Sequence, residues 1–335
     1  MYPNTLLSQT EINLWYNYNN RSLKRIPHLN MATYLITGGA GFIGSHLAER
    51  LLKDNHEVII IDNLSTGKRE NLPSNIKFYQ EDICHQSLVR TLMRKADACF
   101  HLAAVASVQK CQDQWLTSHQ TNLTGTISIL NAAKENHTPV IYASSSAVYG
   151  DNTQLPLNEL ADKIPLSAYA ADKLACELHA NVASQAFNVP TIGLRFFNVY
   201  GTRQDPNSPY SGVIPIFLKN ITNNQPITIF GDGQQSRDFI FIDDVIDGLL
   251  AAAKHCNCQS HVLNLCTGKQ STLIELYQML EKITQNKIEC RFKPARQGDI
   301  LHSCGNTKKA KQILNFEAKV SLYHGLKQLY NLHQF

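Results

Sequence analysis

The sequence of 335 residues has no apolar run long enough to cross a membrane, and it has little net charge. A membrane-spanning helix needs about 20 consecutive apolar residues, and no segment approaches that length. The formal net charge is +4 and is dispersed along the chain, so it gives no argument for nucleic-acid binding. We therefore expect neither a membrane nor a nucleic acid as a partner. A mildly basic cleft would still suit a small anionic ligand.

The nine cysteines are irregularly spaced, and residues 1–30 lack the apolar core of a secretory signal peptide. Reduced thiols in the cytoplasm are therefore the expected state. The cluster formed by His255–Cys258 and His261 lacks the Cys-x-x-Cys knuckle of structural zinc sites, so no metal site is predicted. Met31 directly precedes the first predicted strand, so either the native chain starts there or residues 1–30 form a loosely attached arm.

Short apolar runs alternate with amphipathic stretches, and no internal repeat or low-complexity segment interrupts them. This alternation predicts a parallel sheet with right-handed crossovers, in which ligands bind at the carboxyl ends of the strands. The predicted strands are Thr33–Thr37, Glu57–Ile61, Ile76–Gln80, Ala98–Leu102, Pro139–Ser144, Thr191–Phe196 and Val262–Leu265. The main predicted helices are Phe42–Asp54, Trp115–Asn136 and Asp243–Lys254. The fold class is therefore α/β, with a Rossmann-type doubly wound parallel sheet.

The alternation weakens beyond Phe196, and residues 198–235 hold much of the proline and several glycines. We predict that residues 31–197 and 236–265 form a dinucleotide-binding domain. Residues 198–235 and 266–335 are expected to form a smaller, mostly helical domain that binds the substrate. The second domain is therefore discontinuous in sequence.

A glycine-rich turn lies between the first predicted strand and the first predicted helix. Gly38, Gly41 and Gly44 occupy this turn, where glycine permits close approach of a pyrophosphate to the N–H groups of the helix N-terminus. Asp62 ends the next strand about 20 positions on, where an acidic residue accepts from ribose hydroxyls and repels a 2′-phosphate. NAD is therefore favoured over NADP, although the nearby basic segment Lys68-Arg69 weakens this preference.

A tyrosine and a lysine four residues apart form the second informative pattern. Tyr169 and Lys173 lie on one face of a helix, because four residues make about one turn. A phenol has a reference pKa of about 10, and a neighbouring ammonium favours its ionised form. The pair is therefore a candidate general base for an alcohol, with the hydroxyl of Ser145 as a bridge to the substrate. Beside a dinucleotide site, such a base indicates hydride transfer between an alcohol and a ketone.

Together these motifs resemble the extended short-chain dehydrogenase/reductases, and among them the nucleotide-sugar 4-epimerases of the UDP-galactose and UDP-N-acetylglucosamine kind. The resemblance runs from about Met31 to the C-terminus. The segments that carry it are Thr37–Gly44, Asp62-Asn63, Asp82-Ile83, His101–Ala104, Asn122, Ser144–Gly150, Tyr169–Lys173 and Arg195–Gly201. The resemblance implies NAD as a cofactor that is regenerated at each turnover, a UDP-sugar as substrate, and a homodimer.

The resemblance also implies which residues form the site. Ser145, Tyr169 and Lys173 are the expected catalytic residues. The expected cofactor-binding residues are Gly38, Gly41, Phe42, Ile43, Gly44, Asp62, Asn63, Thr66, Gly67, Asp82, Ile83, Leu102, Ala103, Ala104, Asn122, Ser144, Tyr169, Lys173 and Phe196. The expected substrate-binding residues are Ser107, Ser145, Ser146, Asn198, Gln204, Ser211, Gly212, Val213, Arg237, Arg296, Asp299 and Ser303.

Three of these residues have a second interpretation when the residues alone are considered. Asp82 either contacts the adenine or is an ordinary turn aspartate. Arg237 and Arg296 either hold a diphosphate through their planar guanidinium groups or form surface ion pairs. The resemblance favours the phosphate role for both arginines, and for Asp299 it implies a place near the uridine ribose.

The residues after Ser145 bear on the reaction. Related dehydratases and decarboxylases carry an acid beside the catalytic hydroxyl, whereas this chain has Ser146 and Ala147. This absence favours epimerases and simple reductases, and the preference for NAD argues against NADPH-dependent reductases. The resemblance places a gate for the sugar at Ser303, where a small residue admits an N-acetyl group. A shift of one residue in the alignment would place Cys304 there, which is also small.

The sequence therefore predicts 4-epimerisation of a UDP-hexose, with UDP-GlcNAc and UDP-GalNAc preferred and UDP-Glc and UDP-Gal also accepted. A UDP-glucuronate 4-epimerase remains an alternative, but no group for the extra carboxylate is evident. A non-catalytic NAD-sensing regulator is an alternative of a different class. Such a protein would typically lack the tyrosine or the lysine, and both are present.

Overall fold

A seven-stranded parallel sheet forms the centre of the structure, a computed structural model that describes residues 31–206, 212–257, 259–295 and 300–332. The strand order is β11-β6-β5-β4-β1-β2-β3, so the order reverses between β1 and β4. The strands are β1 (Thr33–Thr37), β2 (Glu57–Ile61), β3 (Lys77–Tyr79), β4 (Ala98–His101), β5 (Val140–Ser145), β6 (Thr191–Phe196) and β11 (His261–Leu265). The predicted doubly wound fold is confirmed, with small shifts at several strand ends.

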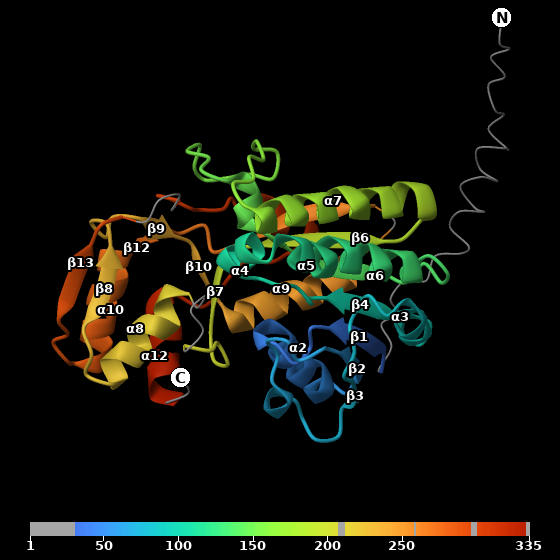
Figure 1. Ribbon diagram of the computed structural model, residues 1–335, viewed down its shortest axis with the longest axis horizontal. Helices are drawn as coiled ribbons and strands as arrows, with labels where there is room; N and C mark the ends of the chain where they lie inside the picture. The colour runs from blue at the N-terminus through green and yellow to red at the C-terminus, as the bar shows by residue number, and fades with distance from the viewer. Residues whose placement is uncertain (1–30, 207–211, 258, 296–299, 333–335) are drawn as a thin grey trace, which may run out of the picture.

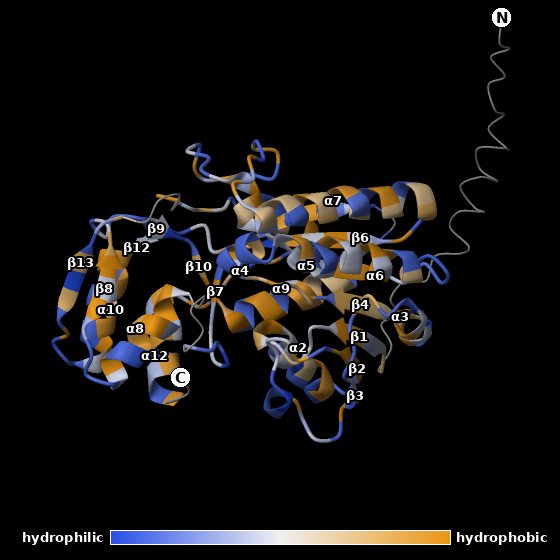
Figure 2. Ribbon diagram, viewed as in Figure 1, coloured by the Kyte–Doolittle hydropathy of each residue, from blue (hydrophilic) through white to orange (hydrophobic). Residues whose placement is uncertain are grey.

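Helices cover both faces of the sheet because alternate strand residues point to opposite sides. Ile36 and Ile60 belong to a core that includes helices α2 and α9, whereas Leu35 and Ile59 belong to a second core under α3, α6 and α7. The helices of this part are α2 (Phe42–Lys53), α3 (Gln86–Met93), α4 (Val108–Asp113), α5 (Trp115–His119), α6 (Gly125–Ala133), α7 (Ala168–Phe187), α9 (Ile242–His255) and α11 (Lys308–Leu314). Figure 2 shows the apolar colour concentrated in the central strands and on α9.

A π-helical segment joins α5 to α6. This segment, η2 (Gln120–Thr124), makes one continuous helical run of the region predicted as Trp115–Asn136. Such segments are rare and often occur at functional sites. Short 3₁₀ turns, η1 (Arg69–Asn71) and η3 (Ser146–Tyr149), follow the ends of β2 and β5.

A smaller region lies beyond the carboxyl ends of the central strands, at the left in Figure 1. Its helices are α8 (Val213–Thr222), α10 (Leu273–Thr284) and α12 (Leu322–Leu332). Strands β7 (Asn198–Tyr200) and β10 (Phe239–Phe241) pair in parallel, as do β8 (Ile227–Phe230) and β13 (Cys290–Lys293), while β9 (Ser236–Arg237) and β12 (Ser271–Thr272) pair antiparallel. The sequence analysis expected a mostly helical region here, without bounds for its helices. It did not predict these short strands, because their partners are distant in sequence and leave no hairpin signal.

Two further expectations concern a membrane-spanning helix and segments that the structure does not describe. Within them, no helix is long and apolar enough to span a membrane. The proposed N-terminal arm lies outside the described residues, and so does Cys258 of the candidate metal cluster.

Candidate active site

A cavity of about 770 Å³ lies where the carboxyl ends of the central strands meet the smaller region. This is the position that ligands occupy in doubly wound sheets, where the strand order reverses. Of the predicted site residues, those that line the cavity are Gly38, Gly41, Phe42, Ile43, Gly44, Asp62, Asn63, Thr66, Asp82, Ile83, Leu102, Ala103, Ala104, Ser144, Ser145, Tyr169, Lys173, Phe196, Asn198, Gln204 and Gly212. Segments far apart in sequence are thus brought to one cleft.

The glycine-rich turn has the shape that a pyrophosphate site requires. Gly38 has φ of +70°, and a Cβ atom there would lie 2.6 Å from the backbone nitrogen of Ala103. No other residue fits this position without moving the loop after β4. Gly41 caps α2 with an extended backbone. The residues of the first helical turn, whose N–H groups have no partner within the helix, form part of the cavity wall. The turn therefore fits the diphosphate of a dinucleotide.

Asp62 ties this turn to the end of β2. Its two carboxylate oxygens accept from the backbone N–H groups of Ala40, at 2.9 Å, and Leu64, at 2.8 Å. Burial raises the pKa of Asp62, and these two hydrogen bonds act in the opposite direction. Each oxygen keeps a second lone pair, so the carboxylate can also accept from ribose hydroxyls. Lys68, whose charge weakens the argument against a 2′-phosphate, lies in the cavity wall and is 4.0 Å from Asp205.

The three predicted catalytic residues come from two neighbouring elements. Ser145 ends β5, and its hydroxyl accepts from the backbone N–H of Ala147 at 3.1 Å. Tyr169 stands in the first turn of α7, which begins after Ser167 caps the helix. Lys173 follows one turn later, and its Nζ atom lies 5.8 Å from the centre of the Tyr169 ring. The Lys173 side chain is almost fully buried, so its charge acts on the tyrosine with little screening by water.

A buried polar network supports the strand that carries Ser145. The Ser144 hydroxyl donates to Glu177, and Arg195 binds both oxygens of that carboxylate, at 2.9 and 2.7 Å. Arg195 also donates to the Tyr149 hydroxyl, which donates to Asn264. Burial is the largest cause of the raised pKa of Tyr149, about 12. This network was not predicted, because single polar residues in buried strands give no periodic signal.

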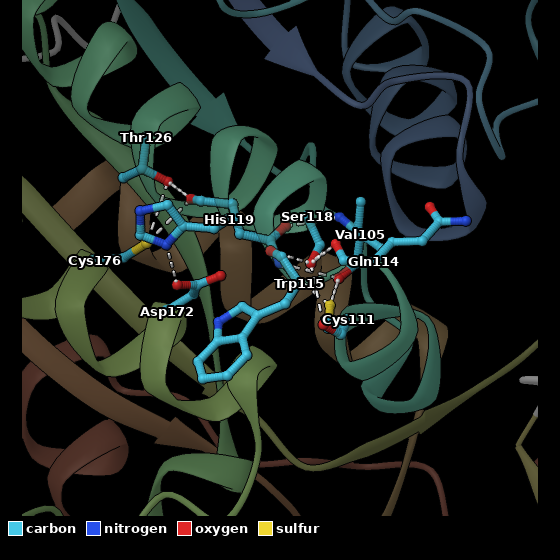
Figure 3. Close-up of polar contacts among 10 residues, drawn as sticks. Val105, Cys111, Gln114, Trp115, Ser118, His119, Thr126, Asp172 and Cys176 are labelled. Carbon is cyan, nitrogen blue, oxygen red and sulfur yellow. Dashed lines mark hydrogen bonds and ion pairs between the residues drawn. The ribbon is translucent and has the colours of Figure 1, made fainter.

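Asn122 has a structural task that the sequence did not indicate. It stands in the π-helical segment and is buried. Its side-chain oxygen accepts from the backbone N–H of Val105 at 2.8 Å, and its side-chain N–H donates to the carbonyl of Val105 at 3.2 Å. Figure 3 shows the surrounding contacts, in which Cys176 of α7 donates to Thr126. Asn122 does not line the cavity; it shapes the loop after β4, which does.

Several predicted residues lie away from the cavity wall. Ser107 caps α4 by accepting from Lys110, at 3.0 Å. Arg237 and Ser303 are held by backbone pairing: the Ser303 N–H donates to the carbonyl of Ser236, and Arg237 donates to the same carbonyl and to that of Leu301. Gly67, Ser146 and Val213 are also absent from the cavity wall. Ser211, Arg296 and Asp299 lie outside the described residues.

The cavity wall also contains residues that the sequence analysis did not select. These are Ser65, Lys68, Asn71, Glu81, Ala106, Thr121, Ala143, Phe197, Val199, Arg203 and Asp205. Most are neighbours in sequence of selected residues, so a wider window around each motif would have found them.

Residues 34–266 match the NAD dependent epimerase/dehydratase family. The chain belongs to this family. It is 33% identical over 300 residues to a putative UDP-glucose 4-epimerase of Methanocaldococcus jannaschii, covering 89% of this chain and 97% of the relative. A UDP-N-acetylglucosamine 4-epimerase of Methanobrevibacter ruminantium, solved with UDP-N-acetylmuramic acid, superposes with a TM-score of 0.87 at 35% identity. That match covers 92% of this chain and all of the solved one.

The family also contains enzymes of other activity. A UDP-N-acetyl-alpha-D-glucosaminuronate decarboxylase of Bacillus cytotoxicus is 33% identical over 310 residues, covering 88% of this chain and 95% of the relative. The predictions of the family, of NAD as cofactor and of an NAD-dependent nucleotide-sugar 4-epimerase are confirmed. The identity of the sugar requires a separate argument.

Proposed function

We propose that this protein interconverts UDP-GlcNAc and UDP-GalNAc, and more slowly UDP-Glc and UDP-Gal, by inverting the sugar at carbon 4. The observation that carries this proposal is the meeting of Ser145, Tyr169 and Lys173 with the glycine-rich turn in one cavity. The turn and Asp62 would hold the diphosphate and the adenosine ribose of NAD. NAD, when bound, supplies the acceptor and donor of a hydride.

The residues of this chain move the proton in this reaction. Tyr169, beside the buried ammonium of Lys173, acts as the base that takes the proton of the sugar 4-hydroxyl, and the Ser145 hydroxyl bridges the two oxygens. Loss of a hydride from the same carbon gives a 4-keto sugar, which turns about its diphosphate and presents its other face. Return of the hydride and of the tyrosine proton gives the epimer. Because the sugar must turn, the diphosphate has to be held firmly, and Arg237 and Arg296 are assigned this role.

The surroundings of Ser145 favour epimerisation over elimination or decarboxylation. The next two residues, Ser146 and Ala147, carry no acid, and the Ala147 N–H is occupied by the Ser145 hydroxyl. The resemblance implies that related decarboxylases and dehydratases carry an acidic residue beside this hydroxyl. Without it, the 4-keto sugar has no neighbouring acid and base for a second reaction and is reduced again.

The preference for an N-acetylated sugar rests on Ser303. Its backbone N–H donates to the carbonyl of Ser236, at 3.1 Å, which places it beside the proposed diphosphate arginine, Arg237. A serine at this point leaves room for an acetamido group. Cys304, the other candidate for the gate, is buried to a similar extent, with 5% of its surface exposed against 8% for Ser303. The choice of Ser303 therefore rests on the resemblance to the 4-epimerases.

We also propose that the protein is a homodimer that pairs through α5 and α7. These helices contact one another and expose Trp115 and Leu116 on α5 and Leu178 and Val182 on α7. Large exposed apolar side chains on two helices in contact favour a protein partner over water. Sedimentation of the wild type and of Leu178→Glu tests this: the variant should become monomeric.

A substrate panel tests the proposed function. The rate of epimerisation should follow the order UDP-GlcNAc, then UDP-Glc, with UDP-glucuronate last. Equal or greater activity on UDP-glucuronate would favour the alternative assignment. NAD carried by the purified protein without turnover of any UDP-sugar would point to the regulatory alternative instead.

A further inference from the structure

A buried carboxylate lies inside the catalytic turn of α7, where the proposed function gives it no task. Asp172 lies between Tyr169 and Lys173 in the sequence, and its side chain is only 6% exposed. Its Oδ1 atom lies 2.7 Å from Nδ1 of His119, while Oδ2 is buried without a hydrogen-bond partner. Figure 3 shows this pair, with the imidazole of His119 reaching from α5 to α7. A buried carboxylate with one free oxygen is costly unless a charge balances it.

His119 is able to supply that charge. It is the last residue of α5, its side chain is 39% exposed, and its contact with Asp172 is an ion pair when the ring carries a proton on both nitrogens. A protonated imidazole donates from both nitrogens, one to Asp172 and the other to solvent. The next turn of α7 is fastened to the same helical run, because Cys176 donates to the carbonyl of Asn122 and to the hydroxyl of Thr126. The distance between His119 and Asp172 is therefore fixed by packing on both sides.

The balance of charge matters because Lys173 acts on Tyr169 through its electric field. The ammonium of Lys173 is buried and donates a hydrogen bond to a neutral group, the carbonyl of Ala143. An uncompensated carboxylate on the same helical turn would offset this positive field and disfavour the phenolate.

Other ionisable groups around the turn do not change this balance. Burial raises the pKa of the thiols of Cys111 on α4 and Cys176 on α7, so both stay neutral. His101 at the end of β4 is buried, and burial followed by the charge of Lys173 lowers its pKa to about 3, so it is also neutral. Arg195 on β6 and Glu177 on α7 form a buried ion pair, so together they add no net charge. The groups that remain are Asp172 and His119.

We propose that His119 is a positioning residue that neutralises Asp172 as a protonated partner, so that the field of Lys173 acts undiminished on Tyr169. This proposal rests on the proposed role of Tyr169 as the base. It makes the helix before the π-helical segment part of the catalytic apparatus, although no atom of His119 lines the cavity. The competing explanation is that the pair only fastens α5 to α7.

The test is the pH dependence of kcat in His119→Gln, Asp172→Asn and the double variant. Glutamine can still donate a hydrogen bond to the carboxylate but carries no charge. We expect His119→Gln to move the acid limb of the profile upward by on the order of one pH unit, about a tenfold loss of rate on that limb. In the double variant, the acid limb should return close to that of the wild type, because the carboxylate at position 172 has been removed. His179→Gln changes an exposed histidine on α7, the helix of Asp172, and is the matched control that should leave the acid limb in place.

The outcome that overturns the proposal is a loss of kcat by the same factor at every pH in His119→Gln, with no recovery in the double variant. Bound NAD and the thermal midpoint are measured in each preparation to establish that it is folded. If His119→Gln does not fold, the Asp172→Asn variant alone tests the proposal. The acid limb of its pH profile should then stay in place or move to lower pH, and a move to higher pH would contradict the proposal.

A second measurement separates this proposal from the proposed function. Ultraviolet difference titration detects the tyrosinate that is present in the parent protein and missing in Tyr169→Phe, without any substrate. Its midpoint should move upward in His119→Gln and return in the double variant. A protein that turns over no UDP-sugar but shows this shift would contradict the proposed reaction and keep the electrostatic role. An unmoved midpoint would contradict the role of His119 whatever the substrate.

Discussion

The Nζ atom of Lys173 lies 2.7 Å from the carbonyl oxygen of Ala143, two residues before Ser145 on the same strand. This hydrogen bond fastens the helix that carries the proposed base to the strand that carries the proposed bridging hydroxyl. The pairing of β5 with β4 ends at Tyr142, whereas its pairing with β6 continues to Ser145, so Ala143 lies just beyond the end of β4. The relative position of Tyr169 and Ser145 is thus set by the backbone and by one buried lysine.

Replacement of Tyr169 by phenylalanine removes the proton acceptor and keeps the ring. We expect kcat to fall by a factor on the order of 10²–10⁴, the usual contribution of a positioned general base. NAD content should change little, because the variant leaves the glycine-rich turn and Asp62 unaltered. Steady-state kinetics and the absorbance of extracted nicotinamide check both parts. A variant with near-normal turnover would end the assignment.

Changes at Asp62 should alter both cofactor affinity and cofactor choice. Asp62→Ala removes the ribose acceptor and also the anchor of the Ala40 and Leu64 N–H groups, so NAD binding should weaken. Asp62→Asn is the matched variant: it keeps the shape, loses the charge, and should chiefly reduce the discrimination against NADP. Equilibrium dialysis with both dinucleotides measures the two effects. Unaltered binding in both variants would make Asp62 merely a structural carboxylate.

Enlarging the proposed gate should change specificity more than activity. Ser303→Tyr is expected to lower kcat/KM for UDP-GlcNAc much more than for UDP-Glc, because the phenol ring fills the space of the acetamido group. Ser303→Ala should leave the ratio of the two values unchanged. An unchanged ratio in a folded, NAD-loaded tyrosine variant would remove the reason to prefer the N-acetylated sugar.

Acid should destabilise the fold partly through His101. Its ring is buried between the hydroxyls of Thr37, at 2.7 Å, and Thr126, at 2.9 Å. Thr126 donates its own proton to Asn122, so it accepts from Nε2–H of a neutral imidazole whose Nδ1 accepts from Thr37. Burial, and after it the charge of Lys173, lowers the pKa of His101 from 6.5 to about 3.

The sign of the effect follows from proton uptake on unfolding. The unfolded histidine binds a proton below pH 6.5 and the folded one does not, so stability is present above 6.5 and falls as the pH drops toward 3. In His101→Gln, the slope of unfolding free energy against pH between those values should fall by about 1.4 kcal/mol per pH unit. Urea titrations at several pH values measure this slope. An identical slope in the variant would contradict the buried neutral state.

Breaking the buried ion pair between Arg195 and Glu177 should lower the unfolding free energy far more than breaking an exposed ion pair. Arg195→Met leaves Glu177 buried without its partner, and we expect a loss of about 3–5 kcal/mol of unfolding free energy. The control is Arg291→Met, whose pair with Glu289 is more than half exposed and should contribute close to zero. Urea unfolding of both variants gives the comparison. Similar losses in the two would show that the Arg195 network is not a structural centre.

The central sheet was predictable because its information is local. Thr33–Thr37, Glu57–Ile61 and Thr191–Phe196 are strands with the expected bounds, since each is a short apolar run between breakers. The short strands of the smaller region were missed for the opposite reason. Ile227–Phe230 pairs with Cys290–Lys293, about sixty residues on, and nothing in either segment alone identifies its partner.

The sequence by itself determined the fold class, the family, the cofactor and the residues proposed for proton transfer, because each depends on residue type at a fixed spacing along one turn or one helix. Only the tertiary structure decided which polar groups compensate one another. The contact of His119 with Asp172 joins two helices across 53 positions, and the network of Ser144, Glu177 and Arg195 joins a helix and two strands. Electrostatic balance depends on distance and burial in space, and those are fixed only when separate elements pack together.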